Sequence, residues 1–275
     1  MRRAPIFAGV VFLAGACALA YFPKAAARQQ AQQNPPQQNP TQQLPAQQAA
    51  PVPQGIAAPK TSEALRTVVL DAAHGGTDSG ARGPNGVAEK DIVLEFAQAV
   101  ANSLRAQGFQ VVMTREGDTD PAFDDRAQTA NGQSGAIFIS LHVGSAGPVG
   151  SVRTYTYMFP ATQTVQGANG NLAQALGAPS GFLLWDEAQK SYVAQSGKLG
   201  DLIQVELADK FKGSPNISWS APVYQLRSIA EPAVTVEVAN ITMDRVKLEA
   251  MTPDLASGIT RAVMAYKTIY PPGGK

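Results

Sequence analysis

Short apolar runs rich in β-branched residues alternate with segments of helical spacing, and this order constrains the fold of the chain more than any other feature. The runs at residues 67–71, 109–114 and 136–143 have the length and composition of buried strands. Between them, residues 91–107 carry apolar side chains on one helical face, and residues 124–131 predict a shorter helix. The order strand, helix, strand, helix, strand predicts an α/β sheet with parallel neighbours.

The rest of the pattern fits the same architecture. Residues 153–159 and 233–239 have strand character, whereas residues 186–212 and 252–269 predict long helices, the last with Pro253 in its first turn. We therefore predict a single α/β domain whose twisted sheet is mostly parallel, with mixed pairing, and is flanked by helices.

A candidate export segment stands at the start of the chain. Residues 1–27 start with a methionine and two arginines, and an uncharged apolar run follows at residues 4–22. This arrangement predicts export to the periplasm or cell envelope. Small residues at 18–20 and 25–27 fit signal cleavage, while the length of the run also suits an inner-membrane anchor, so both outcomes stay open. Cys17, inside the run, is interpreted as a small hydrophobic residue rather than a lipid attachment site.

A tether then separates this segment from the domain. Residues 28–60 consist almost wholly of Gln, Pro, Ala and Asn and carry no charge between their two ends. Such a composition cannot bury enough apolar surface to offset the entropy of ordering, which predicts a disordered linker. Residues 61–275 remain for the folded domain, a length typical of one domain.

The charge balance and the cysteine count exclude several kinds of site. The chain has 22 Lys and Arg against 21 Asp and Glu, for a net charge of +1, so a nucleic-acid partner is not expected. With 1 cysteine in the chain there is neither an internal disulfide nor a thiolate zinc finger. A metal would have to be held by His74, His142 and carboxylates.

Both histidines follow strand cores, at strand ends that open onto one crevice in a parallel sheet. Glu89 precedes the first helix, and Glu237 stands in an otherwise apolar strand, where an unpaired carboxylate is costly. Two imidazoles and one carboxylate with an open position are typical of hydrolytic zinc. The alternatives are hydrogen-bonded histidines at strand ends and a Glu89 that simply complements the helix dipole.

Five separated motifs make the domain similar to a known family. They are VLDAAHGG at 69–76 with Asp78 and Gly80, EKD at 89–91 after Gly86, GFQVVMTR at 108–115 with Asp118, Arg126 and Asn131, ISLH at 139–142, and PAVTVE at 232–237. In this order they resemble the zinc-dependent N-acetylmuramoyl-L-alanine amidases, which hydrolyse the amide between N-acetylmuramic acid and L-alanine in peptidoglycan. The resemblance implies Zn²⁺ held by His74, Glu89 and His142, with Glu237 as the catalytic carboxylate, and peptidoglycan as substrate; an activating protein stays unknown.

Three further residues have two interpretations each. Arg115 and Arg126 match motif positions, and structural pairing with Asp118, Asp124 or Asp125 is favoured over substrate contact. Asp71 is expected either to orient a ligand histidine or to serve the turn at the strand end.

The chain also departs from the family pattern. Ala73 stands where glycine is usual, Gly144 where asparagine is usual, and Ala239-Asn240 where Gly-Phe is usual. These departures affect the groove and substrate contacts rather than the ligand set. Residues 161–195 have no close counterpart in the family, and one interpretation is that they form a segment that occludes the site.

Two other functions compete with the amidase interpretation. They are a non-catalytic peptidoglycan-binding relative and a zinc peptidase acting on stem peptides.

Overall fold

The structure is a computed structural model that describes residues 64–159 and 185–270. The expected export segment, the linker and most of the candidate occluding segment, residues 161–184, lie outside the described residues. Within the described ranges no helix is both long and apolar enough to cross a membrane.

A six-stranded sheet forms the centre of the domain, in the order β2-β1-β3-β6-β4-β5. Its strands are β1 (Thr67–Ala72), β2 (Gln110–Met113), β3 (Ala136–Gly144), β4 (Val152–Tyr157), β5 (Trp219–Ala221) and β6 (Ala233–Ala239). The strands β2, β1, β3 and β6 are parallel to one another, whereas β4 runs antiparallel to β6 and parallel to β5. The expected mostly parallel, mixed sheet is confirmed.

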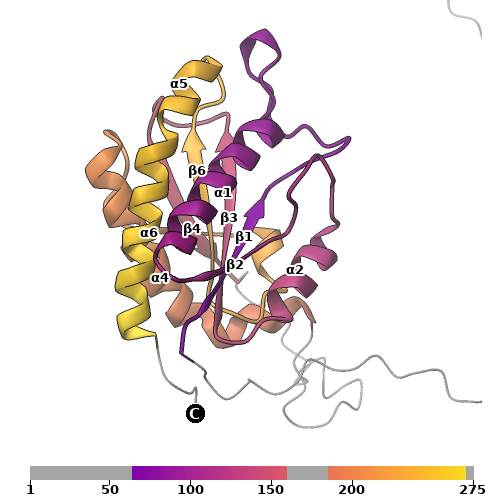
Figure 1. Cartoon of the computed structure of the whole chain (residues 1–275), viewed down its shortest axis with the longest axis vertical. Helices are drawn as coiled ribbons and strands as arrows, with labels where there is room; N and C mark the ends of the chain where they lie inside the picture. Colours follow the sequence, from indigo (N-terminus) through magenta and orange to yellow (C-terminus); the bar gives the residue numbers. More distant parts are fainter. Residues whose placement is uncertain (1–63, 160–184, 271–275) are drawn as a thin grey trace, which may run out of the picture. The chain divides into compact units, whose positions relative to one another are not determined.

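Three long helices cover one face of this sheet (Figure 1): α1 (Glu89–Ala106), α4 (Val193–Lys210) and α6 (Thr252–Ile269). Their apolar stripes meet alternate residues of the strands, among them Leu70, Ile139 and Val236, in one continuous core. Burying a side chain of this size contributes about 1.5–3 kcal/mol, so this layer holds the sheet in place.

Shorter elements of the described ranges pack on the other face. The short helix α2 (Phe123–Asn131) and the 3-10 helix η3 (Tyr224–Leu226) pack on part of this face. They do so through a smaller apolar cluster that includes Val69, Phe138 and Leu226. Toward the carboxyl ends of β3 and β6 this face turns polar, with Ser140 and His142 beside Thr235 and Glu237. Among the described residues, His142 and Glu237 stay partly exposed where these parallel strands end, whereas Ser140 and Thr235 are buried.

The predicted boundaries agree with the structure for most elements, and one prediction is wrong. The helix expected at 186–212 is two elements, the 3-10 helix η2 (Trp185–Tyr192) followed by α4. The amide of Gln189 in η2 donates to the carbonyls of Ile229 and Glu231, and these long-range bonds fix a backbone path that periodicity does not report. The elements β5, α5 (Arg245–Ala250) and η1 (Pro84–Gly86) were not predicted.

Candidate metal centre

His74 lies in a tight loop immediately after β1. Its backbone φ is 61°, and Gly75 and Gly76 follow with φ of 134° and 51°. A Cβ atom at Gly75 would lie 1.9 Å from the carbonyl oxygen of Thr119, so only glycine fits this position. The loop turns the imidazole across the strand ends, where its Nδ1 forms a 2.6 Å hydrogen bond with Oδ2 of Asp78.

Glu89 is the first residue of α1, and its buried carboxylate turns back toward the sheet. Its Oε2 accepts a hydrogen bond from the backbone N–H of Ala81 at 2.8 Å and lies 3.2 Å from Nε2 of His74. Its Oε1 accepts from the backbone N–H of Val143 and lies 2.9 Å from Nδ1 of His142. The carboxylate therefore joins the two predicted histidines, a role that the helix-dipole interpretation did not require.

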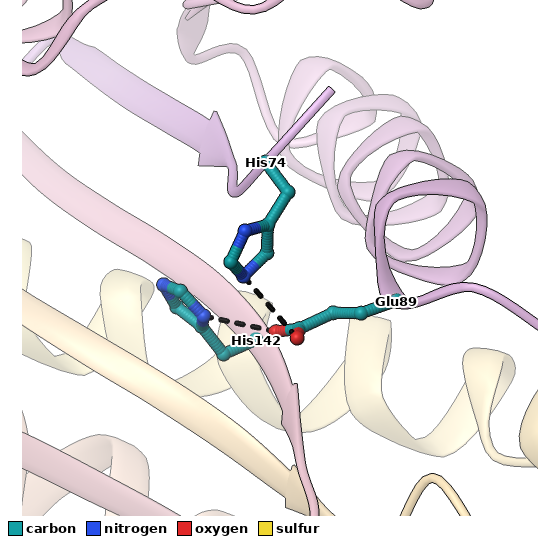
Figure 2. A group of neighbouring side chains, drawn as sticks. All are labelled: His74, Glu89 and His142. Atoms are coloured by element: carbon teal, nitrogen blue, oxygen red, sulfur yellow. Dashed lines mark hydrogen bonds and ion pairs between the residues drawn. The ribbon is translucent and has the colours of Figure 1, made fainter. Parts of the chain in front are cut away.

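His142 projects from the carboxyl end of β3 and completes the group. Its ring packs edge-on against the ring of His74, with 5.2 Å between centroids. The candidate ligand atoms of His74, Glu89 and His142 all lie within 4.8 Å of one another, so the structure brings together the three residues that the sequence singled out (Figure 2).

The ionised carboxylate of Glu89 dominates the electrostatics of this group. Burial alone would raise the pKa of Glu89, but hydrogen bonds from His142, His74 and the Ala81 N–H hold it well below its ordinary range. The hydrogen bond to Glu89, against the opposing effect of burial, raises the pKa of His74 to about 9. A buried carboxylate that stays ionised between two ring nitrogens matches the donor set of a divalent zinc ion.

Glu237 lies directly beside this group. In the β3–β6 pairing its Cα partner is His142, so the two side chains occupy neighbouring positions on the same face of the sheet. Burial raises the pKa of Glu237, and the nearby Glu89 adds to this effect while His142 and Arg153 oppose it. A carboxyl group with a raised pKa beside a candidate metal site is suited to accepting and returning a proton.

Two cavities flank His142. One, of about 310 Å³, is lined by His74, Asp78 and Phe123 among others, and a second, of about 280 Å³, is lined by Tyr155 and Glu237 among others. His142 and Gln225 line both. A chain-like substrate could therefore extend to either side of the candidate ligands.

Comparison with known proteins assigns this domain to a family. The family model described as N-acetylmuramoyl-L-alanine amidase matches residues 68–265. This range contains all three candidate ligands and Glu237. The chain belongs to the N-acetylmuramoyl-L-alanine amidase family.

Curated members of the amidase family share parts of the sequence. The amidase AmiA of Escherichia coli K12 is 43% identical over 83 residues, which are 30% of this chain and 29% of AmiA. The amidase AmiC of E. coli O6:H1 is 26% identical over 237 residues, which are 78% of this chain and 57% of AmiC. The matches cover about a third of the length of each of the first three curated relatives: 29%, 31% and 37%.

Solved structures of the amidase family share the fold. The N-acetylmuramoyl-L-alanine amidase of Clostridium difficile 630 aligns with a TM-score of 0.55 and 24% identity, covering 74% of this chain and 97% of that one. The amidase Ami1 of Mycobacterium smegmatis aligns with a TM-score of 0.54 and 18% identity, covering 76% and 99%. These likenesses confirm the architecture predicted from the sequence.

The two arginines of the amidase motifs are structural, but their predicted partners are wrong. Arg115 donates to the backbone carbonyls of Ala72, Ala73, Lys90 and Gly117. Arg126 pairs with Asp71 at 2.6 Å and with Asp120 at 3.3 Å. Backbone carbonyl groups, the distant carboxylate of Asp71 and the nearby Asp120 satisfy these guanidinium groups, in place of Asp118, Asp124 or Asp125.

For Asp71 the turn interpretation is wrong, and its link to a histidine is only indirect. Its carboxylate is buried and accepts hydrogen bonds from Thr114, Arg126 and Ser140, so it neither serves a turn nor contacts a histidine directly. It is the counter-ion of a buried arginine beneath the site.

Two contacts to the histidines were missed. Asp78 was part of a motif without a role, and Gln225 was not singled out at all, although its Nε2 lies 2.9 Å from Nε2 of His142. The available signal was a polar residue in the mostly apolar run from Val223 to Leu226, shortly before the strand that carries Glu237.

Proposed function

We propose that this protein hydrolyses the amide bond between N-acetylmuramic acid and L-alanine in peptidoglycan. The observation that carries the proposal is the convergence of His74, Glu89 and His142 beside Glu237, in a domain of the amidase family. Peptidoglycan is the proposed partner, and Zn²⁺ the proposed cofactor.

The chain's own residues divide the work. His74, Glu89 and His142 would hold the zinc ion, which when bound polarises a carbonyl group and lowers the pKa of water. Glu237 accepts the proton of the attacking water and passes it to the departing amine of L-alanine, which must leave protonated. The cavities on either side of His142 offer room for the glycan and the stem peptide.

The small number of histidines limits which residues can transfer protons. The chain has 2 histidines, and both belong to the proposed ligand set. No imidazole is left to act as a general base, so proton transfer falls to Glu237. The proposed chemistry therefore predicts a large loss of rate when this carboxylate is removed.

We propose the following organisation for the remainder of the chain. Residues 1–27 direct export, either as a cleaved signal or as an inner-membrane anchor, and residues 28–60 tether the catalytic domain, residues 61–275, so that it reaches the cell wall. The intact mass of the protein recovered from cells tests this directly. A mass lacking about the first 20 to 27 residues supports a cleaved signal, a full mass in the membrane fraction supports an anchor, and a full-length protein in the cytosol contradicts export.

Digestion of purified sacculi tests the enzymatic proposal. The zinc-loaded protein is incubated with sacculi, and the released fragments are identified by mass spectrometry. Stem peptides that begin with a free L-alanine amine are expected. The variant Glu237→Gln should lower this rate by about 10²- to 10⁴-fold while still binding zinc, and chelation should abolish it.

A matched control and three outcomes make the digestion decisive. The variant Glu249→Gln changes an exposed carboxylate on α5 and should digest sacculi at the wild-type rate. Unchanged sacculi in the presence of bound zinc would refute the amidase and favour a peptidoglycan-binding protein. Cuts within the stem peptide would favour a zinc peptidase instead.

A further inference from the structure

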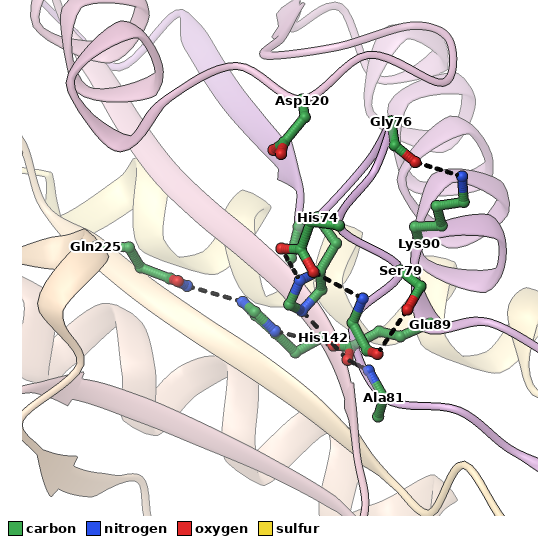
Figure 3. Close-up of polar contacts among 12 residues, drawn as sticks. His74, Gly76, Ser79, Ala81, Glu89, Lys90, Asp120, His142 and Gln225 are labelled. Carbon is green, nitrogen blue, oxygen red and sulfur yellow. Dashed lines mark hydrogen bonds and ion pairs between the residues drawn. The ribbon is translucent and has the colours of Figure 1, made fainter.

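Gln225 occupies the junction between the candidate metal site and both cavities. It belongs to η3, and its side chain points at the outer edge of the His142 ring (Figure 3). Its Nε2 lies 2.9 Å from Nε2 of His142, 3.0 Å from Oγ of Ser140 and 3.2 Å from Oγ1 of Thr235. One amide thus ties the ring to two neighbouring strands.

Each ring nitrogen of the two histidines has a separate partner. The nitrogens that face inward, Nε2 of His74 and Nδ1 of His142, meet the two oxygens of Glu89. The nitrogens that face outward meet Asp78 and Gln225. Outer partners of this kind fix the orientation and the tautomer of a metal-binding histidine. Gln225 holds for His142 the place that the Asp78 carboxylate holds for His74.

The position of this amide is itself anchored below the site. The hydroxyl of Ser140, which accepts from Gln225, donates to Oδ2 of Asp71 at 2.7 Å. Asp71 is locked in turn by its ion pair with Arg126. Because these groups are buried and hydrogen-bonded, the Gln225 side chain is held by a network rather than by its own rotamer preference.

An amide differs from a carboxylate because it has both a donor and an acceptor end. The amide nitrogen of Gln225 lies against Nε2 of His142, on the side of the ring away from Glu89. A cation held at Nδ1 would require the ring proton on Nε2, where it needs an acceptor. The Oε1 end of the same amide supplies such an acceptor.

We propose that Gln225 is a positioning residue that orients His142 for metal binding. The inference rests on the proposed function, since it concerns the same zinc site. Because the amide contacts a ligand histidine, its removal should lower the affinity for the metal as well as the rate of turnover.

Zinc affinity of the full-length protein, measured by competition with a chromogenic chelator, tests the proposal. The variant Gln225→Met keeps the length of the side chain without its hydrogen bonds, and we expect zinc affinity to fall by about 10- to 100-fold. The variant Gln225→Glu restores an acceptor for Nε2–H and should bind zinc at least as tightly as the wild type. Tyr224→Ala, which changes an exposed neighbour in η3, should leave the affinity unchanged.

Nitrogen NMR of the wild-type protein gives a second readout that no folding defect can disturb. The chain has 2 histidines, so their ring signals are easily assigned. After addition of zinc the proton of His142 is expected on Nε2, with Nδ1 as the metal-binding nitrogen. These ring signals should be broadened or absent in Gln225→Met.

The outcomes separate this inference from the function on which it rests. Wild-type zinc affinity in Gln225→Met, or a zinc-bound His142 whose proton is not on Nε2, overturns the role of Gln225 and leaves the amidase proposal intact. A wild-type protein that binds no zinc overturns both. A loss in Gln225→Met with recovery in Gln225→Glu, at unchanged melting temperatures of the metal-free variants, supports the proposal.

Discussion

Gly144 shows how one missing side chain shapes the site. It ends β3, two residues after His142, and a Cβ atom there would lie 2.5 Å from Oε1 and 2.6 Å from Cδ of Glu237. The obstructing atoms belong to the end of a flexible side chain, so Gly144→Ala should fold normally but displace the carboxylate. We expect the rate of sacculus digestion to fall at least about tenfold, because a misplaced proton acceptor loses much of its catalytic contribution.

The matched control is Gly197→Ala on α4, where a Cβ atom meets nothing within 4 Å. This variant should digest sacculi at the wild-type rate. Zinc affinity should stay unchanged in Gly144→Ala, which separates a displaced Glu237 from a damaged metal site. Wild-type digestion by Gly144→Ala would show that the position of Glu237 seen here is not required.

The ion pair of Asp71 and Arg126 supports the site from below. Both side chains are almost fully buried, and their Oδ1 and Nη1 atoms are 2.6 Å apart. We expect Asp71→Asn to lower the free energy of unfolding by about 3 kcal/mol, since it leaves a buried guanidinium without its counter-ion. The exposed pair of Lys190 and Glu187 is the comparison, and Glu187→Gln should cost at most about 1 kcal/mol. Equal losses in urea denaturation would contradict a special role for the buried pair.

The same pair predicts a dependence of stability on pH. Burial alone would raise the pKa of Asp71, but the Arg126 charge and the hydroxyls of Thr114 and Ser140 bring it below its ordinary value. A carboxylate with a lowered folded-state pKa contributes its full stability above the unfolded value of about 3.9 and loses it as the pH falls through the folded value. The free energy of unfolding should therefore decline below about pH 4 in the wild type, and less steeply in Asp71→Asn. Parallel acid curves for the two proteins would exclude this origin.

Residues whose chemistry conflicts with their local pattern could be predicted from the sequence. His74, His142 and Glu237 are polar residues at or near the ends of apolar runs, and such conflicts mark functional sites. Gln225 is also a polar residue in a mostly apolar run, but that run does not indicate its contact with His142, which forms only because η3 folds back over β3 and β6. No local pattern specifies that contact between distant segments.

Elements follow the same division between local and long-range information. The helix α1 and the strands β3 and β6 are long and strongly patterned, so their boundaries were close to those predicted. The strand β5 has 3 residues and is defined by pairing with β4, which periodicity over so short a stretch cannot reveal.

The packing of α4 against α6 gives a prediction at this scale. Gly258 of α6 is buried at the contact, and a Cβ atom there would lie 2.8 Å from Cδ2 of Leu207 on α4. Gly258→Val should lower the free energy of unfolding by about 1–3 kcal/mol, because the added branches overpack the contact. Gly197→Val, on an open surface of α4, should change it by less than about 0.5 kcal/mol. Similar melting temperatures for the two variants would mean that the helices can separate to admit a larger side chain.

At the scale of the whole molecule, the site joins segments that are far apart in the sequence. The loop after β1, the start of α1 and the ends of β3 and β6 each contribute one residue of the set His74, Glu89, His142 and Glu237. They meet only because the parallel strands place their carboxyl ends along one edge. A cation bound there should therefore bind the folded chain much more tightly than the unfolded one.

Zinc should accordingly stabilise the entire domain. A ligand that binds only the folded state at 100 times its dissociation constant adds about 2.7 kcal/mol, which for a domain of this size corresponds to a rise in Tm of about 5–10 °C. Calorimetry of the full-length protein with zinc, and after exhaustive chelation, measures this difference. The shift should vanish in Glu89→Ala, which removes the carboxylate that bridges both histidines, but persist in Glu237→Gln, which leaves the three ligands in place. A Tm shift of equal size in Glu89→Ala would mean that zinc binds elsewhere, because zinc at this site can stabilise the fold only through the residues that meet at this edge of the sheet.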